Sequence, residues 1–165
     1  MKSRGFLFSI FVFSILFLTV SAYGQDIPIG FFAPITGPAA ADGASAKNAV
    51  ELGLKEVNEA GGINGKKINL IIYDDRLNPQ EAVAIANKLI EKDKVIGVVS
   101  GSYSGPTRVT APLFQKAGIP MVAGYAVHPD VTWDPKEKNP MIFAFVMGFS
   151  AKLKEQRLPS SPLRI

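Results

Sequence analysis

Short apolar runs alternate with amphipathic segments from Asp26 onward. The apolar runs predict buried β-strands, which we place at residues 27–32, 68–73, 95–99, 119–123 and 142–146. The amphipathic segments predict helices, at about residues 44–60, 79–92 and 106–116. The first helix carries Val50, Leu54 and Val57 at helical spacing on one face. The alternation βαβαβαβ with nearly continuous apolar strands predicts an α/β fold, a parallel sheet with helices on both faces.

Local signals set the expected helix boundaries. Asn78 is predicted as the N-cap of the second helix, Pro79 as its first-turn proline and Glu81 as its capping-box acid. Gly118 is expected to end the third helix. Pro112 conflicts with a regular helix, because it lacks an N–H and crowds the preceding turn. The sequence therefore predicts either a kink or a late helix start there.

The first 24 residues have the pattern of a secretory signal peptide. Two basic residues precede an uncharged run over residues 5–20. Small residues within 21–24 are typical of a signal-peptidase site and predict cleavage before Gln25. The alternative is a membrane anchor, but a run of about 16 residues is short for the roughly 20 that span a bilayer as a helix. The pattern predicts export from the cytoplasm, with cleavage near Gly24.

The formal net charge of +4 lies mainly at the two ends of the chain. Residues 5–150 hold 12 basic and 13 acidic residues, a net charge of −1, without aromatic residues interleaved among the basic ones. This distribution argues against nucleic-acid binding. The sequence has no cysteine, which excludes disulfides, cysteine zinc sites and thiol nucleophiles.

Enzyme signatures are weak. The segment Gly101–Gly105 resembles a nucleophile elbow, but no serine in it has glycines two residues before and two after. His128, the single histidine, is interpreted as a solvated loop residue. The pair Asp74 and Asp75 follows a strand, where adjacent side chains point in opposite directions and make a poor metal clamp. Three roles remain open for this pair: solvation, helix capping and proximity to a ligand. Taken together, these motifs predict that the protein is not an enzyme and has no cofactor and no metal site.

The loops after the strands are the expected ligand-binding edge, because ligands of parallel sheets bind beyond the carboxyl ends of the strands. The loop over residues 100–105 leads into the third helix. Its serines offer hydroxyl donors, and the helix start offers unpaired N–H groups that attract a carboxylate. The alternative is a serine- and glycine-rich turn that only caps its helix.

A series of short motifs in fixed order makes the sequence similar to a known family. The series is Ile29-Gly30, Thr36-Gly37-Pro38-Ala39-Ala40, Gly43, Ala46-Lys47-Asn48, Glu56 to Gly65, Tyr73-Asp74-Asp75, Pro79-Gln80-Glu81-Ala82 and Lys116-Ala117-Gly118-Ile119-Pro120. It resembles the periplasmic leucine/isoleucine/valine-binding proteins, the substrate-binding subunits of ABC-type amino-acid importers. The resemblance runs from about Asp26 to Phe149.

The resemblance implies a type I periplasmic-binding-protein fold, with two α/β lobes, a hinge and a ligand closed between the lobes. It implies that Ser102 and Ser104 hold the ligand carboxylate together with backbone N–H groups. It also places Tyr125, Ala126 and Val127 in a second ligand loop. Val127 departs from the family, which often has Thr or Ser there.

A further departure is Asp42, where the family commonly has an aromatic residue. Asp42 is interpreted either as the N-cap of the first helix or as a residue that tunes ligand choice. Family members are about twice as long, so residues 25–149 are expected to form the N-terminal lobe only. Residues 150–165 match neither the family nor a βα continuation, and are interpreted as an atypical tail from a frameshift or gene fragment, with a genuine basic tail as the alternative.

The sequence thus predicts an exported solute-binding protein, present as its first lobe. The expected partners are a small-molecule ligand, an amino acid of the branched-chain type or a related carboxylate, and the membrane subunits of an ABC permease. The runner-up is a sensor domain of a receptor or regulator with the same fold. A hydrolase is a distant third.

Overall fold

The computed structural model describes residues 25–134, 138–140 and 144–146. The predicted signal peptide and the predicted tail over residues 150–165 lie outside this part of the chain. The elements are β1 (Ile27–Ala33), α2 (Ala40–Glu59), β2 (Ile68–Asp74), α3 (Pro79–Glu91), β3 (Gly97–Ser100), α4 (Ser104–Ala117), β4 (Met121–Ala123), η1 (Pro129–Val131), β5 (Trp133–Asp134), β6 (Asn139–Pro140) and β7 (Ala144–Val146).

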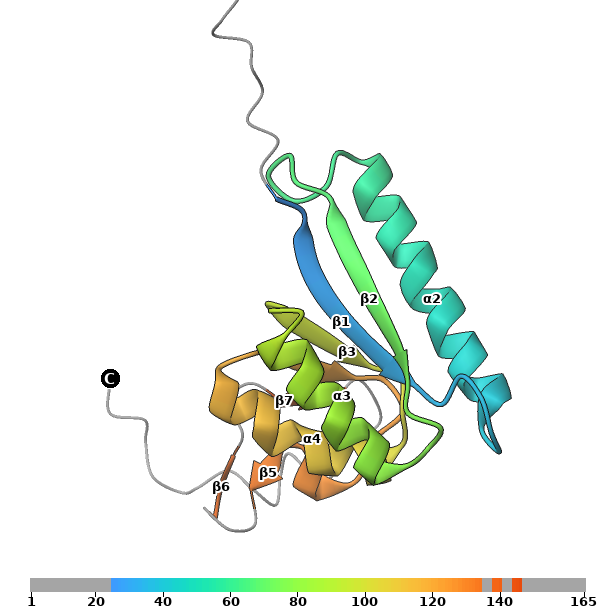
Figure 1. Ribbon diagram of the computed structural model, residues 1–165, viewed down its shortest axis with the longest axis vertical. Coiled ribbons are helices and arrows are strands. Elements are labelled where there is room, and N and C mark those ends of the chain that lie inside the picture. Colours follow the sequence, from blue (N-terminus) through green and yellow to red (C-terminus); the bar gives the residue numbers. More distant parts are fainter. Residues whose placement is uncertain (1–24, 135–137, 141–143, 147–165) are drawn as a thin grey trace, which may run out of the picture.

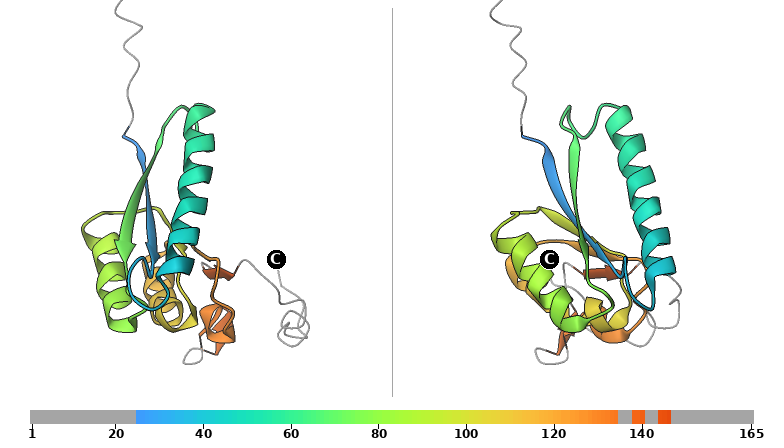
Figure 2. Two further views of the ribbon diagram at one scale, coloured as in Figure 1. Left: turned by 90° about the vertical axis from the view of Figure 1, so that its right-hand side faces the viewer. Right: turned by 45° about the vertical axis from the view of Figure 1, so that its right-hand side comes forward.

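The main sheet has five strands in the order β2-β1-β3-β4-β7, and every neighbouring pair is parallel. Helix α2 lies on one face of the sheet, and α3 and α4 lie side by side on the other (Figure 1). The two turned views in Figure 2 show the same three layers. This arrangement confirms the predicted α/β fold with helices on both faces.

The core lies between the sheet and the pair α3 and α4. Phe32 of β1, Leu89 of α3, Phe114 of α4 and Met121 of β4 are all fully buried there. The rings of Phe32 and Phe114 stack with their centroids 6.5 Å apart. These contacts hold α3 and α4 against the sheet.

Helix α2 is held differently. Its predicted apolar face is only partly covered, since Val50 and Leu54 are half-buried and Val57 is exposed. At its carboxyl end the Asn58 side chain bonds both backbone groups of Ile68, donating to the carbonyl oxygen at 3.0 Å and accepting from the N–H at 2.8 Å. The Asn58 side chain thus links α2 to β2, because it bonds the N–H and the carbonyl oxygen of one residue as a paired strand does.

The start of α3 follows the predicted N-cap. The Asn78 side chain accepts hydrogen bonds from the backbone N–H groups of Gln80 and Glu81. The backbone N–H of Asn78 donates to the Asp75 carbonyl oxygen. The Glu81 side chain therefore does not complete a reciprocal capping box.

Two other helix starts differ from the sequence-based expectation. Helix α2 begins at Ala40 rather than near residue 44, and α4 begins at Ser104 rather than Pro106. The predicted late start at Pro112 is wrong, because α4 continues through this residue to its left-handed cap at Gly118.

None of the helices in residues 25–134 combines the length and the apolar character needed to cross a membrane.

Candidate ligand-binding site

The predicted ligand loops emerge side by side from the sheet. Phe32 of β1 pairs in register with Ser100 at the end of β3, and Ser100 pairs with Ala123 at the end of β4. The loops that follow β3 and β4 therefore leave the same edge of the sheet. The Ser100 and Thr107 hydroxyls, 2.8 Å apart, hold the first of these loops against α4.

The start of α4 offers unpaired backbone donors. Its N-cap is Tyr103, which makes no side-chain cap, and the first regular N–H bond runs from Thr107 to the Tyr103 carbonyl oxygen. The N–H groups of Ser104 and Gly105 have no acceptor within the described part of the chain, and Pro106 has no N–H. The helix dipole adds partial positive charge at the same place. This is the local chemistry of an anion-binding helix start.

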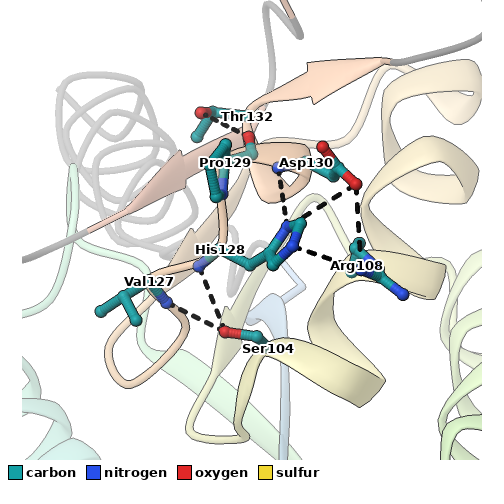
Figure 3. Close-up of polar contacts among 7 residues, drawn as sticks. All are labelled: Ser104, Arg108, Val127, His128, Pro129, Asp130 and Thr132. Carbon is teal, nitrogen blue, oxygen red and sulfur yellow. Dashed lines mark hydrogen bonds and ion pairs between the residues drawn. The ribbon is translucent and has the colours of Figure 1, made fainter. Parts of the chain in front are cut away.

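Ser104 connects this helix start to the loop after β4. Its Oγ accepts hydrogen bonds from the backbone N–H groups of Val127 at 3.1 Å and His128 at 3.2 Å (Figure 3). Ser104 is the acceptor in both bonds, and its hydroxyl proton has no acceptor among the described residues. Ser104 is therefore able to donate to an incoming carboxylate.

His128 belongs to a small charged network beside Ser104. Its Nδ1 accepts from the Asp130 backbone N–H at 3.2 Å, and its Nε2 lies 3.5 Å from an Arg108 nitrogen. Arg108 in turn lies 3.8 Å from the Asp130 carboxylate (Figure 3). The network joins α4 to η1 and partly compensates the Arg108 charge. The interpretation of His128 as a merely solvated residue missed these contacts.

Ser102 lies beneath the surface rather than on it. Its side chain is fully buried, and so is the side chain of Asp75 at the end of β2. The Ser102 Oγ and the Asp75 Oδ2 are buried polar atoms without a hydrogen-bond partner among the described residues. The other Asp75 oxygen accepts from the Leu77 N–H at 2.9 Å.

Burial raises the pKa of Asp75. The Ser102 hydroxyl is close enough to oppose this rise in part, although the two groups do not reach hydrogen-bond geometry, and the Leu77 N–H opposes it as well. The nearby Asp74 charge adds to the rise. Asp75 is thus a buried acid whose charged form is disfavoured in the folded protein.

Asp75→Asn is expected to change how stability depends on pH. The pKa of Asp75 is higher in the folded than in the unfolded protein. The stability that this acid contributes is therefore fully present below the unfolded-state pKa and is lost as pH rises through the folded-state pKa. Asparagine has no such loss and keeps an acceptor for the Leu77 N–H. Urea unfolding from about pH 4 to about pH 8 should show the variant gaining stability relative to the wild type. A difference that stays constant with pH would refute this.

Asp42, Tyr103 and Tyr125 gather at the same edge. Asp42 lies in the first turn of α2, whose N-cap is Ala39, so the N-cap interpretation of Asp42 is wrong. The cause is the earlier start of α2. Instead, the Tyr103 hydroxyl donates to the Asp42 carboxylate, and this hydrogen bond raises the pKa of Tyr103. The Tyr103 and Tyr125 rings lie with centroids 5.9 Å apart.

The remaining predicted residues lie in the loop after β4. Ala126 is fully buried, whereas Val127 is 64% exposed. The backbone N–H of Val127 donates to Ser104, and its apolar side chain is exposed at this edge of the sheet. Within the described residues, no group of three or more His, Cys, Asp or Glu side chains is arranged to hold a metal ion.

A family profile described as periplasmic binding protein matches residues 26–155. This chain belongs to the periplasmic binding protein family. The family is one of solute-binding proteins rather than enzymes, as the motif series in the sequence predicted.

Curated and solved relatives place the chain more narrowly. It is 33% identical over 116 residues to the leucine-, isoleucine-, valine-, threonine- and alanine-binding protein of Pseudomonas aeruginosa, covering 70% of this chain and 31% of the relative. The branched-chain amino acid transporter substrate-binding protein LivJ of Streptococcus pneumoniae, solved with isoleucine, matches with a TM-score of 0.66 and 30% identity. That match covers 74% of this chain and 33% of LivJ.

A third similar structure carries a different kind of ligand in its description. The solute-binding protein of an ABC transporter from Rhodopseudomonas palustris, in complex with 3,4-dihydroxybenzoic acid, matches with a TM-score of 0.62 and 28% identity, covering 72% of this chain and 31% of that one. The chain thus spans about a third of the length of the relatives it matches.

Tyr103 is a candidate site residue that the sequence did not predict. It stands between two predicted ligand serines in a loop whose backbone is extended at Tyr103, with φ of −75° and ψ of 176°. Successive side chains of an extended segment alternate in direction. That alternation was the available signal, since it places Ser102 inward and Tyr103 outward.

Proposed function

We propose that this chain is part of an exported solute-binding protein that captures an amino acid or a related carboxylate for an ABC importer. Its membrane partners would be the permease subunits of that importer. The names of the relatives describe branched-chain amino-acid binding and ABC transport, and they support this proposal. The proposal includes export to the periplasm, with the signal peptide cleaved near Gly24.

The observation that carries the proposal is the start of α4. Two unpaired backbone N–H groups, those of Ser104 and Gly105, and the Ser104 hydroxyl proton meet at the carboxyl edge of the sheet. A carboxylate placed there gains charge-assisted hydrogen bonds and the favourable end of the helix dipole. Binding needs no covalent step.

The other predicted residues take supporting places in this proposal. Ser104 is better placed than Ser102 to bond the ligand directly, because Ser102 has no exposed surface. Ser102 and Ala126 support the two loops from beneath. Val127 fixes Ser104 through its N–H, and Asp42 and Tyr125 face the rest of the ligand.

Ser104→Ala is expected to weaken carboxylate binding about tenfold. A hydrogen bond to a charged group contributes about 1.5–3 kcal/mol, and 1.4 kcal/mol is tenfold in affinity. Ligand-observed NMR titration of the 165-residue chain with L-leucine measures the dissociation constant. A dissociation constant on the order of millimolar is expected for a site formed by one lobe, and this method covers that range.

Two comparisons make that titration decisive. Ser104→Thr retains the hydroxyl and should recover most of the lost affinity. L-leucinamide, which lacks the carboxylate, should bind the wild type and the alanine variant equally poorly. Equal leucine affinity for the wild type and Ser104→Ala would reject the carboxylate assignment.

A further inference from the structure

Two tyrosine rings lie together at the carboxyl edge of the sheet. Tyr103 comes from the loop after β3 and Tyr125 from the loop after the neighbouring strand β4. Their centroids are 5.9 Å apart with planes tilted by 40°, and each residue is 38% exposed. The rings therefore contact each other while keeping a substantial part of their surface open.

The tyrosine pair is joined to the carboxylate site through the backbone. Tyr103 is the N-cap of α4 and directly precedes Ser104, whose N–H is one of the unpaired donors. Tyr125 lies two residues before Val127, whose N–H donates to the Ser104 Oγ at 3.1 Å. The backbone of each tyrosine is therefore within two residues of a group that hydrogen-bonds, or is free to bond, at the start of α4.

Asp42 adds a charge and an acceptor beside the rings. One carboxylate oxygen accepts a hydrogen bond from the Tyr103 hydroxyl, and this bond fixes the orientation of the Tyr103 ring. The other oxygen, Oδ1, has no hydrogen-bond partner among the described residues. It can accept from a hydroxyl or ammonium group on a ligand, and its negative charge disfavours a second ligand carboxylate.

We infer that the ligand is an aromatic monocarboxylate bearing a hydrogen-bond donor, with its carboxylate at the start of α4 and its ring against Tyr103 and Tyr125. The inference rests on the proposed function and deepens it. An aliphatic side chain gains only area burial at these rings. An aromatic ring also gains offset or edge-to-face contact, which corresponds to about three- to tenfold in affinity.

Two matched ligand pairs test the inference on the 165-residue chain by ligand-observed NMR titration. L-phenylalanine is compared with L-leucine, and 4-hydroxybenzoate with cyclohexanecarboxylate. The expected result is at least one aromatic member binding about fivefold or more tightly than its aliphatic counterpart. Both members of the first pair carry an ammonium, so a preference within it reports the ring alone, whereas a preference within the second pair reports the ring and its hydroxyl together.

Variants tie the preference to the rings. Tyr125→Leu is expected to reduce the aromatic-to-aliphatic affinity ratio to about one. Ile96→Ala, at an exposed position before β3 at the opposite edge of the sheet, should keep the wild-type ratio. Amide NMR spectra establish that each variant is folded, and Tyr103→Leu replaces Tyr125→Leu if the latter does not fold.

The outcomes separate the inference from the function on which it rests. Aliphatic carboxylates that bind as tightly as the aromatic ones, or a preference that survives the loss of a ring, overturn the inference and leave the carboxylate site standing. If none of the four carboxylates binds, the proposed function itself fails.

Discussion

Gly43→Ala is expected to destabilise the protein by about 3 kcal/mol, at the upper end of the cost of overpacking. Gly43 lies in the first part of α2 and is the one buried residue of that helix. A methyl group there would lie 2.1 Å from the Pro34 carbonyl oxygen and 3.0 Å from the Ile35 nitrogen. These are backbone atoms, so no side-chain rotation relieves the overlap. Urea unfolding followed by circular dichroism measures the loss.

The same helix offers a matched control. At Gly53, a methyl group would meet no atom within 4 Å. Because alanine is a better helix former than glycine, Gly53→Ala should raise the free energy of unfolding by about 0.5–1 kcal/mol. The two identical substitutions are thus expected to have opposite signs. If both changed stability by the same amount, close packing of α2 against the β1–α2 loop would be the wrong explanation.

Asp74→Ala is expected to cost about 2 kcal/mol, because several hydrogen bonds to one carboxylate are lost. Asp74 accepts from the backbone N–H groups of Ile35, Thr36 and Arg76 and from the Thr36 hydroxyl. It therefore ties the end of β2 to the loop that leads into α2. Asp74→Asn keeps one acceptor oxygen for these N–H groups and should cost less than half as much.

The dependence of the Asp74 effect on pH has a definite sign. Burial raises the pKa of Asp74, but the hydrogen bonds from Thr36, Arg76 and Ile35 together outweigh it, and the net pKa is lowered. The stability this acid contributes is present above its unfolded-state pKa and is lost as pH falls through the folded-state pKa. The stability difference between the wild type and Asp74→Asn should shrink below about pH 4. A difference that grows there would contradict the hydrogen-bonding account.

The order of elements followed from the sequence because apolar runs and amphipathic segments differ in period. Strand bounds came within one or two residues, whereas the start of α2 was placed four residues late. The loop from Pro34 contains residues that favour turns, and Gly43 in the early part of α2 packs closely against the Pro34 carbonyl group. That contact is tertiary, and no local signal carries it.

The candidate site was predictable in part. A helix after β3 was predicted from local features and strand order, although its start was placed two residues late. The burial of Ser102 against Asp75, and the hydrogen bond of Tyr103 to Asp42, join residues from separate βα units. Such pairings depend on strand register and helix placement, which single-sequence patterns do not specify.

The most direct test of a carboxylate site at the start of α4 is an amide ¹H–¹⁵N NMR titration of the 165-residue chain with L-leucine and, separately, L-leucinamide. A carboxylate site there predicts saturable shifts of the Ser104, Gly105 and Val127 amide signals with L-leucine and not with L-leucinamide. Equal shifts with both compounds, or shifts confined to residues away from the β3–α4 and β4–η1 loops, would contradict it.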